Sequence, residues 1–147
     1  MSQAGTVYAQ ALYELAKDKG LDEVIHSELT MLDDCFAENP DYIRLLRTPN
    51  LSKEERCQIL DQGFRGKIQP YLLNFLKILV EKDYIYLLPD CSRAYTRLYQ
   101  QDHNILSVTA YTAVSLSKVQ EKALTEKLSG ITGKTILLRN QVKPETI

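Results

Sequence analysis

The sequence has no tryptophan, only two histidines and only three cysteines among its 147 residues. Cys35, Cys57 and Cys91 lie far apart, and none of them shows the CxxC or Cys/His spacing of a zinc site. We therefore expect no metal centre, and we interpret the cysteines as buried thiols in a reducing compartment. His26 and His103 lack ligand-type residues at a repeated spacing, so we expect both at the surface and outside any catalytic site.

Long apolar runs are also missing, since crossing a bilayer takes about 20 consecutive apolar residues. The most apolar segment, residues 68–80, is shorter and is followed directly by Glu81, Lys82 and Asp83. The N-terminus carries no basic leader followed by an apolar run, so nothing marks it for secretion. We expect no direct insertion into a membrane and, by default, a cytoplasmic location.

An excess of positive charge is missing as well. The formal net charge is −1, which argues against a protein whose main task is to hold a nucleic-acid backbone. Residues 1–103 contain 12 Lys and Arg against 16 Asp and Glu, whereas residues 104–147 contain 6 against 3. The two parts are therefore expected to meet different partners. Between Asp22 and Asp41 there are seven carboxylates and no Lys or Arg, which we interpret as a solvated face that could attract a basic partner.

Two segments carry more apolar surface than a single core contact requires. Residues 71–81 and residues 6–19 are both largely apolar, and each has one narrow polar stripe at helical spacing, formed by Asn74, Lys77 and Glu81 in the first segment and by Gln10, Glu14 and Lys17 in the second. We predict that both are helices surrounded by protein. The surplus apolar surface favours a binding module over an enzyme.

The other helices of the first hundred residues are predicted from their start and stop signals. Asn39-Pro40 ends a helix over residues 21–38 and precedes a short one over residues 41–47. Ser52 and Glu55 have the spacing of a capping box and open a helix that ends near Gly63. The last long helix runs from Pro89 to about Asp102. This part of the chain is therefore expected to be entirely helical.

The hydrophobic period changes after His103. Apolar and polar residues alternate over residues 106–114, which predicts a strand. Ser117 and Gln120 form a second capping box, and we expect Gly130 and Gly133 to end that helix before a β-rich run over residues 135–142. The predicted fold class is mostly α, with a six-helix bundle in residues 1–103 followed by a small β-α-β lobe in residues 104–147, which we interpret as truncated.

One short motif resembles a phosphate-binding loop. The motif needs Gly-x4-Gly-Lys-Ser/Thr between a strand and a helix, and residues 130–135 end in Gly133, Lys134 and Thr135. Leu128 stands at the position of the first glycine, and the predicted order is helix then strand, so no helix N-terminus faces a phosphate. We therefore predict no nucleotide binding.

Several segments together resemble a known family. The segment from Tyr8 to Ala16 (YAQALYELA), the pair Asn39-Pro40, and the run from Leu72 to Leu76 that continues to Pro89 are similar to the delta subunit of bacterial F-type ATP synthase. That subunit is the counterpart of the mitochondrial oligomycin sensitivity-conferring protein. The resemblance covers nearly the whole chain. Two features differ, because family members usually have Asn-Gly or Lys-Gly at Lys82-Asp83 and continue past Ile147.

The resemblance implies a non-catalytic subunit without cofactors. Such a subunit belongs to the peripheral stalk, on the cytoplasmic face of the cell membrane, and links the catalytic head to the stator so that proton-driven rotation is coupled to ATP synthesis. In the family, the N-terminal helix of an alpha subunit lies between the first and fifth helices, and b-type stalk subunits contact the C-terminal part. The residues that match the alpha-binding positions are Tyr8, Ala11, Asn74 and Ile78.

Two other functions stay open at this point. One is an unrelated helical adaptor that binds a different amphipathic helix. The other is an enzyme or nucleotide-binding domain that uses Gly133 and Lys134. In addition, Tyr8 and Ile78 could belong to the core of a bundle and bind no partner. The exposure of their side chains distinguishes a core residue from a partner-binding residue.

Overall fold

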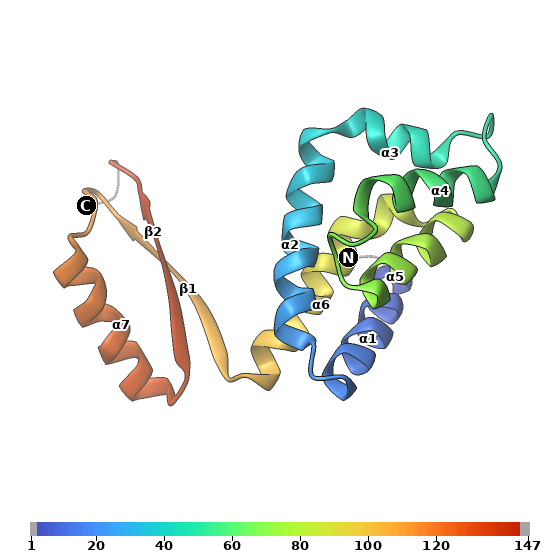
Figure 1. The fold of residues 1–147 in the computed structure, drawn as a ribbon. Helices are drawn as coiled ribbons and strands as arrows, with labels where there is room; N and C mark the ends of the chain where they lie inside the picture. Colours follow the sequence, from blue (N-terminus) through green and yellow to red (C-terminus); the bar gives the residue numbers. More distant parts are fainter. Residues whose placement is uncertain (1–2, 145–147) are drawn as a thin grey trace. The chain divides into compact units, whose positions relative to one another are not determined.

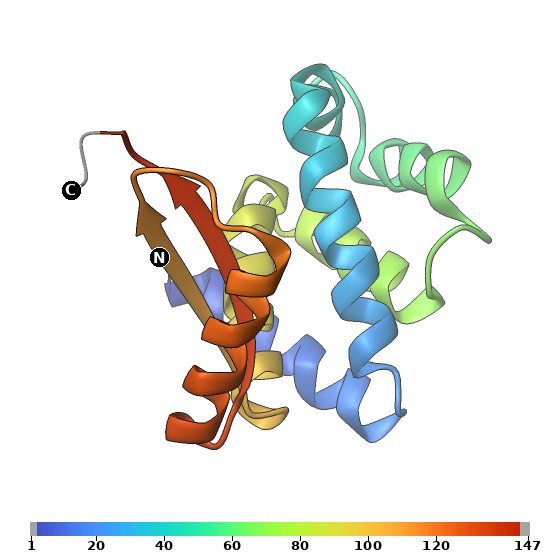
Figure 2. The same cartoon turned by 90° about the vertical axis from the view of Figure 1, so that its left-hand side faces the viewer.

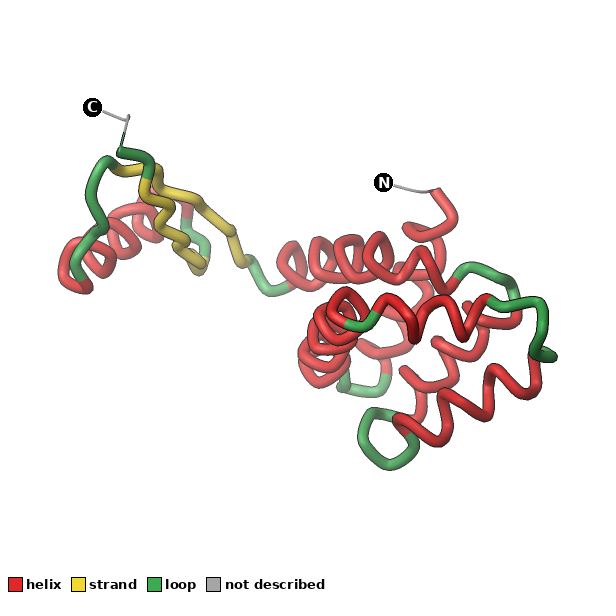
Figure 3. The backbone as a smooth tube through the Cα atoms, turned by 90° about the horizontal axis from the view of Figure 1, so that it is seen from above, coloured by secondary structure: helices red, strands yellow, loops and turns green. Residues whose placement is uncertain are grey.

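A computed structural model of the chain describes residues 3–144 and is mostly helical, with one two-stranded parallel sheet (Figure 1). The elements, in order, are α1 (Gln3–Asp18), α2 (Asp22–Glu38), α3 (Pro40–Arg47), α4 (Lys53–Phe64), α5 (Pro70–Glu81), the 3-10 helix η1 (Ile85–Leu87), α6 (Leu88–Asp102), β1 (Ile105–Thr112), α7 (Lys118–Thr132) and β2 (Thr135–Val142). Figure 3 shows helices throughout the N-terminal part and both strands after α6.

The chain divides into two compact units. The first extends up to Tyr99 and the second begins at Gln100, so the division falls in the last turn of α6. In the first unit α5 contacts α1, α4 and η1. Its side chains Leu72, Leu76, Leu79 and Val80 are completely buried. The most apolar segment of the sequence is therefore at the centre of this unit's core, as its composition predicts.

Local capping interactions determine where α4 and α7 begin. Ser52 Oγ accepts the backbone N–H of Glu55 at 3.1 Å, and Glu55 Oε1 accepts the backbone N–H of Ser52 at the same distance. Ser117 and Gln120 make the equivalent pair of bonds at 3.1 and 2.9 Å. Both predicted capping boxes are therefore confirmed.

The end of α7 differs in part from the prediction. Gly133 adopts a left-handed conformation with φ 69° and caps the helix, as expected. Gly130, however, lies inside α7, so its prediction as a helix stop is wrong. A single glycine in a helix interior costs about 1 kcal/mol, which the capping box and the packing of α7 on β2 offset.

In the second unit β1 and β2 run parallel, with Ile105 opposite Thr135 and Thr112 opposite Val142. Figure 2 shows α7 lying along this pair of strands, and α7 contacts β2. The alternation predicted for the first strand holds only up to Thr112. Val114 lies beyond β1 and is 76% exposed, so its assignment to the drier face of a strand is wrong. The chain turns there towards α7, with Thr112 Oγ1 donating to the Val114 carbonyl at 2.7 Å.

We expect hydrogen exchange to be slower in the first unit than in the second. Leu76 and Leu79 of α5 are fully buried in the core of the first unit. In the described part of the second unit, Ile136 is the only buried hydrophobic residue. Native-state exchange should therefore give the highest protection at Leu76 to Leu79 and lower protection in β1 and β2. Equal protection in both units would contradict independent stability of the helical unit.

The predicted burial of three residues, Cys35, Cys57 and His26, needs correction. Cys91 is buried, but Cys35 and Cys57 are only half-buried, because α2 and α4 lie at the surface of the unit and present these residues at the edge of their buried faces. His26 is half-buried rather than at the surface. Its ring stacks on Tyr99 with a centroid distance of 4.5 Å and an interplanar angle of 5°. The sequence reasoning missed this contact because it joins α2 to α6.

His26 makes the stability of the first unit depend on pH. Burial lowers the pKa of His26 below its ordinary value of 6.5, because the neutral ring is preferred against Tyr99. Above pH 6.5 the contribution of neutral His26 to the free energy of unfolding is fully present. This contribution is lost as the pH drops through 6.5 towards the lower pKa of His26 in the folded state. Thermal melts of the wild type and of His26→Gln should be compared from about pH 8 to about pH 5. As the pH falls, the melting temperature of the wild type should decrease relative to that of the variant. A constant difference would contradict this.

Candidate protein-binding site

The first helix has an accessible apolar stripe next to its buried stripe. Ala9, Leu12 and Ala16 are buried against the rest of the unit. The stripe beside them is only half-buried or exposed, and its members at helical spacing are Ala4, Tyr8, Ala11 and Leu15. Leu15 is 38% exposed. The apolar surface of α1 therefore extends beyond what its own core contact covers.

The fifth helix has a similar stripe. Phe75 and Leu79 are buried, whereas the residues Tyr71, Asn74 and Ile78, at positions i, i+3 and i+7, are exposed. The Ile78 side chain is 44% exposed, which is unusual for isoleucine on the most apolar helix of a protein. These three residues and the four on α1 are called the α1/α5 surface below.

The two stripes belong to helices that contact each other. The ring of Tyr8 packs edge-to-face on the ring of Tyr84, with centroids 5.8 Å apart. Tyr84 lies just beyond the C-terminus of α5 and donates its backbone N–H to the Leu79 carbonyl at 2.7 Å. Tyr8 is therefore held beside the C-terminal end of α5.

The turn after α5 is held by charged side chains. Asp83 has φ 61°, a left-handed conformation that most residues avoid and that glycine adopts freely. The guanidinium of the buried Arg56 donates to Asp83 Oδ1 at 3.2 Å, and Lys53 Nζ lies 3.5 Å from Asp83 Oδ2. The hydrogen bond from Arg56 lowers the pKa of Asp83. These contacts anchor the chain where the Tyr84 ring meets the Tyr8 ring.

Charged residues flank the α1/α5 surface on the side of α4. Lys77 Nζ lies 2.7 Å from Asp61 Oδ1, and Arg65 donates to the same oxygen at 3.1 Å. The hydrogen bond from Lys77 lowers the pKa of Asp61. Asn74 additionally lines a depression of about 200 Å³ at the start of α5. A polar boundary around an apolar stripe is the composition typical of a protein-binding surface.

All four residues assigned from the resemblance lie on this surface. Ala11, Asn74 and Ile78 are exposed, so the alternative that Ile78 belongs to the core does not hold. Tyr8 is half-buried and packs against the hydrophobic core, so part of its side chain does serve the core. Sequence reasoning missed three further members, Ala4, Leu15 and Tyr71. Their signal was present, because each lies three or four residues from a predicted member on the same helix.

The loop that resembles a phosphate-binding motif has a different geometry. Lys134 is exposed between the C-terminus of α7 and the start of β2. A helix C-terminus presents carbonyl oxygens and a partial negative charge, which repel a phosphate. Within residues 3–144 no group of three or more His, Cys, Asp or Glu residues could hold a metal ion. None of the described helices is long and apolar enough to cross a membrane.

Comparison with known proteins identifies relatives over nearly the whole chain. The family described as ATP synthase delta (OSCP) subunit matches residues 5–147. The ATP synthase subunit delta of Desulfitobacterium hafniense (strain DSM 10664 / DCB-2) is 33% identical over 140 residues, which cover 95% of this chain and 78% of the relative. That of Symbiobacterium thermophilum is 33% identical over 141 residues, covering 95% and 75%.

A solved structure shares the fold. A chain in the cryo-EM structure of the Toxoplasma gondii mitochondrial ATP synthase hexamer superimposes with a TM-score of 0.74 at 19% sequence identity, covering 96% of this chain and 78% of that chain. At this identity the likeness concerns the fold alone, while the family match and the bacterial relatives carry the assignment of function. The chain belongs to the ATP synthase delta (OSCP) subunit family and is a non-catalytic component of the peripheral stalk of ATP synthase.

Proposed function

We propose that the α1/α5 surface binds the amphipathic N-terminal helix of an ATP synthase alpha subunit, and so ties this subunit to the catalytic head. The observation that carries the proposal is the exposure of apolar side chains on two contacting helices, with Ala11 and Leu15 on α1 and Tyr71 and Ile78 on α5. Contiguous exposed apolar surface rimmed by polar residues marks protein-binding sites. Membership of the family supports the alpha subunit over an unrelated helical partner.

The residues of the surface suit a helical partner. Ala11 has a small side chain, so a second helix can approach α1 closely at this position. Tyr8 and Ile78 supply apolar contact area, and the Asn74 amide can donate to and accept from a partner's polar groups. A helix of about 20 residues is about 30 Å long and could bury on the order of 800 Å² on each side, which is typical of a specific interface.

The second unit is proposed to contact the b-type stalk subunits on the cytoplasmic face of the membrane. Its described basic residues outnumber its acidic ones, so its charge is opposite to that of the acidic helical unit; they are Lys118, Lys122, Lys127, Lys134, Arg139 and Lys143, against Asp102, Glu121 and Glu126. A protein that joins two different partners needs two chemically different surfaces. The uneven charge of the chain supports this division of tasks between the helical unit and the small sheet.

Titration of the protein with a synthetic peptide of the alpha-subunit N-terminus from the same organism tests the proposal. Isothermal titration should show saturable binding, and amide NMR shifts should concentrate at residues 4–15 and 71–84. A peptide with the same composition but a scrambled order should not bind, because its apolar residues no longer lie on one face. Absence of binding, or shifts that map to α2, α3 and α6, would refute the assignment.

A further inference from the structure

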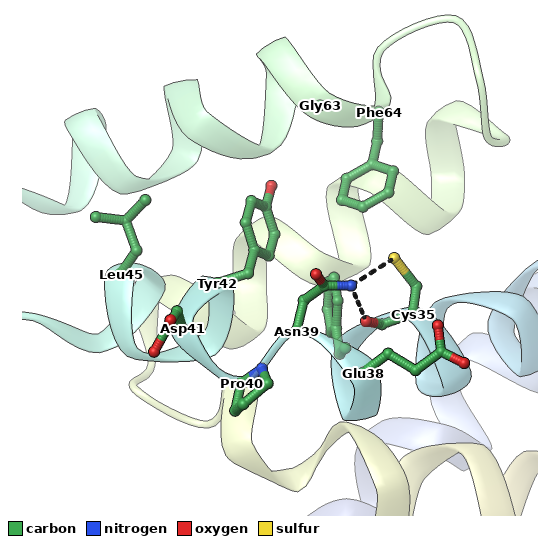
Figure 4. A pocket seen from close by; sticks show the side chains of 10 residues that line it. Cys35, Glu38, Asn39, Pro40, Asp41, Tyr42, Leu45, Gly63 and Phe64 are labelled. Atoms are coloured by element: carbon green, nitrogen blue, oxygen red, sulfur yellow. Dashed lines mark hydrogen bonds between the residues drawn. The ribbon is translucent and has the colours of Figure 1, made fainter.

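A second concave site lies where α2, α3 and α4 meet, and it shares no residue with the α1/α5 surface. The pocket has a volume of about 450 Å³, within the range of sites that bind small ligands or anchoring side chains. Its lining comes from the end of α2, the start of α3 and the end of α4, namely Cys35, Phe36, Glu38, Asn39, Pro40, Asp41, Tyr42, Leu45, Gly63 and Phe64 (Figure 4).

Three aromatic rings form the inner wall of this pocket. Phe36, Tyr42 and Phe64 contact one another, with centroid distances of 5.4, 5.9 and 6.0 Å. Tyr42 Oη donates to the Ile59 carbonyl at 3.3 Å, which fixes the ring against α4. Gly63 permits this approach, because a Cβ there would lie only 3.1 Å from Tyr42 Oη. The wall is therefore preorganised and presents aromatic surface to a ligand.

Two carboxylates lie at the rim. Glu38 and Asp41 are exposed on either side of Pro40 (Figure 4). Asp41 accepts a bond from Arg44 at 2.8 Å, but both side chains are largely in solvent, so this ion pair contributes little and a ligand can replace it. The acidic run that ends at this rim contains no Lys or Arg from Asp22 to Asp41.

We propose that this pocket binds an arginine side chain of a partner polypeptide. A guanidinium is planar and always charged, so it can stack on the aromatic wall while donating to Glu38 and Asp41 at the rim. The same chain already uses this type of contact on α3, where the Arg47 guanidinium lies 4.7 Å from the centre of the Tyr86 ring. A neutral ligand could use the aromatic wall and donate ordinary hydrogen bonds to the carboxylates, but it would lack the charge-assisted bonds that a guanidinium makes.

The surface of α2 favours a polypeptide as the source of the arginine. Val24 and Met31 on α2 are 45% and 49% exposed. Val24, Met31 and Glu38 are spaced seven residues apart. Residues at this spacing lie on one face of a helix. Two exposed apolar side chains, with carboxylates beside them, therefore lie on the face of α2 that leads to the pocket and can contact the residues that neighbour the arginine in a basic amphipathic segment.

A pair of peptides that differ in one charge tests the proposal. The first is a blocked peptide of about eight residues with one arginine between two leucines, and the second carries citrulline, which has a similar shape but no charge, in place of arginine. The arginine peptide should bind the full chain about tenfold more tightly, and raising NaCl from about 50 to about 300 mM should remove most of that difference. Its amide NMR shifts should concentrate at residues 24–45 and 63–64, that is, along α2 and around the pocket. Equal binding of both peptides, or shifts elsewhere, would overturn the proposal.

Variants of the rim provide a matched control. The double substitution Glu38→Gln with Asp41→Asn removes both rim charges and should weaken binding of the arginine peptide by about tenfold without changing that of the citrulline peptide. Both side chains are exposed, so the fold should persist, which circular dichroism checks. Glu54→Gln, an exposed carboxylate at the start of α4, should change neither affinity by more than about twofold. An unaltered affinity in the double variant would refute the role of the rim.

The native thiols report the position of the bound peptide. Cys35 lines the pocket, whereas Cys57 is equally half-buried but lies on α4 outside it. Saturating arginine peptide should slow alkylation of Cys35 by about fivefold or more while leaving Cys57 unchanged, as measured by mass spectrometry. Unchanged alkylation of Cys35, or equal slowing of both thiols, would exclude this pocket as the binding site.

Discussion

Replacing Ile78 by aspartate is expected to weaken binding of the alpha-subunit N-terminal helix by about 2 kcal/mol or more, because a carboxylate would face the apolar side of the partner. The same change should leave helicity and melting temperature near those of the parent, since the Ile78 side chain is already 44% exposed in the free protein. Peptide titration and circular dichroism melts on the same preparation measure both quantities. The pairing of lost affinity with retained stability distinguishes a binding residue from a core residue.

Two further substitutions complete this test. Ala11→Asp should also weaken binding, because it adds charge and bulk where the partner approaches α1 most closely. Val119→Asp is the matched control, because Val119 is 79% exposed on α7, outside the α1/α5 surface, and should leave the affinity unchanged. If the Ile78 and Ala11 variants fold and bind the peptide normally, the α1/α5 surface is not the site.

Features with local causes were predictable from the sequence. The starts of α4 and α7 depend on hydrogen bonds within four residues, between Ser52 and Glu55 and between Ser117 and Gln120, so the residue types alone indicated them. The run over residues 135–142 forms a strand with the predicted bounds because Gly133 ends the helix before it. A glycine alone is a weak signal for the end of a helix, because it costs only about 1 kcal/mol in a helix interior. Gly130 accordingly stays within α7.

Features that depend on distant segments were not predictable. The stacking of His26 on Tyr99 needs α2 and α6 side by side, and no pattern within either helix indicates it. The same is true of the pocket at the α2, α3 and α4 junction, whose wall joins Phe36 and Tyr42 to Phe64. A 3.6-residue period shows which face of a helix is apolar but not which neighbour covers it.

The candidate binding site lies between these two cases. Periodicity indicated that α1 and α5 carry surplus apolar surface, and the structure leaves part of it accessible on both helices. The choice of Tyr8, Ala11, Asn74 and Ile78 came from the resemblance and not from the period, which marks Leu15 and Tyr71 equally well. Pattern therefore located the surface, whereas the partner and the particular residues needed knowledge of the family.

Tyr95 joins three helices of the first unit. Its side chain is completely buried on α6, and its hydroxyl donates to the Asp22 carbonyl at the start of α2 at 2.7 Å. Its ring packs edge-to-face on Tyr13 of α1, with centroids 5.2 Å apart. Burial is the main cause that raises the pKa of the Tyr95 hydroxyl, so this group stays protonated and remains a donor.

Two substitutions at Tyr95 should therefore separate the hydrogen bond from the packing. Tyr95→Phe removes only the hydroxyl and should lower the free energy of unfolding by about 1 kcal/mol, because the Asp22 carbonyl loses a donor in a buried site. Tyr95→Ala also leaves a cavity between α1, α2 and α6 and should cost about 4 kcal/mol. Denaturant unfolding measures both values, with Tyr86→Ala, at a tyrosine that is 47% exposed, as a control expected to cost less than about 1 kcal/mol. An alanine variant at position 95 as stable as the phenylalanine variant would show that the ring does not hold the three helices together.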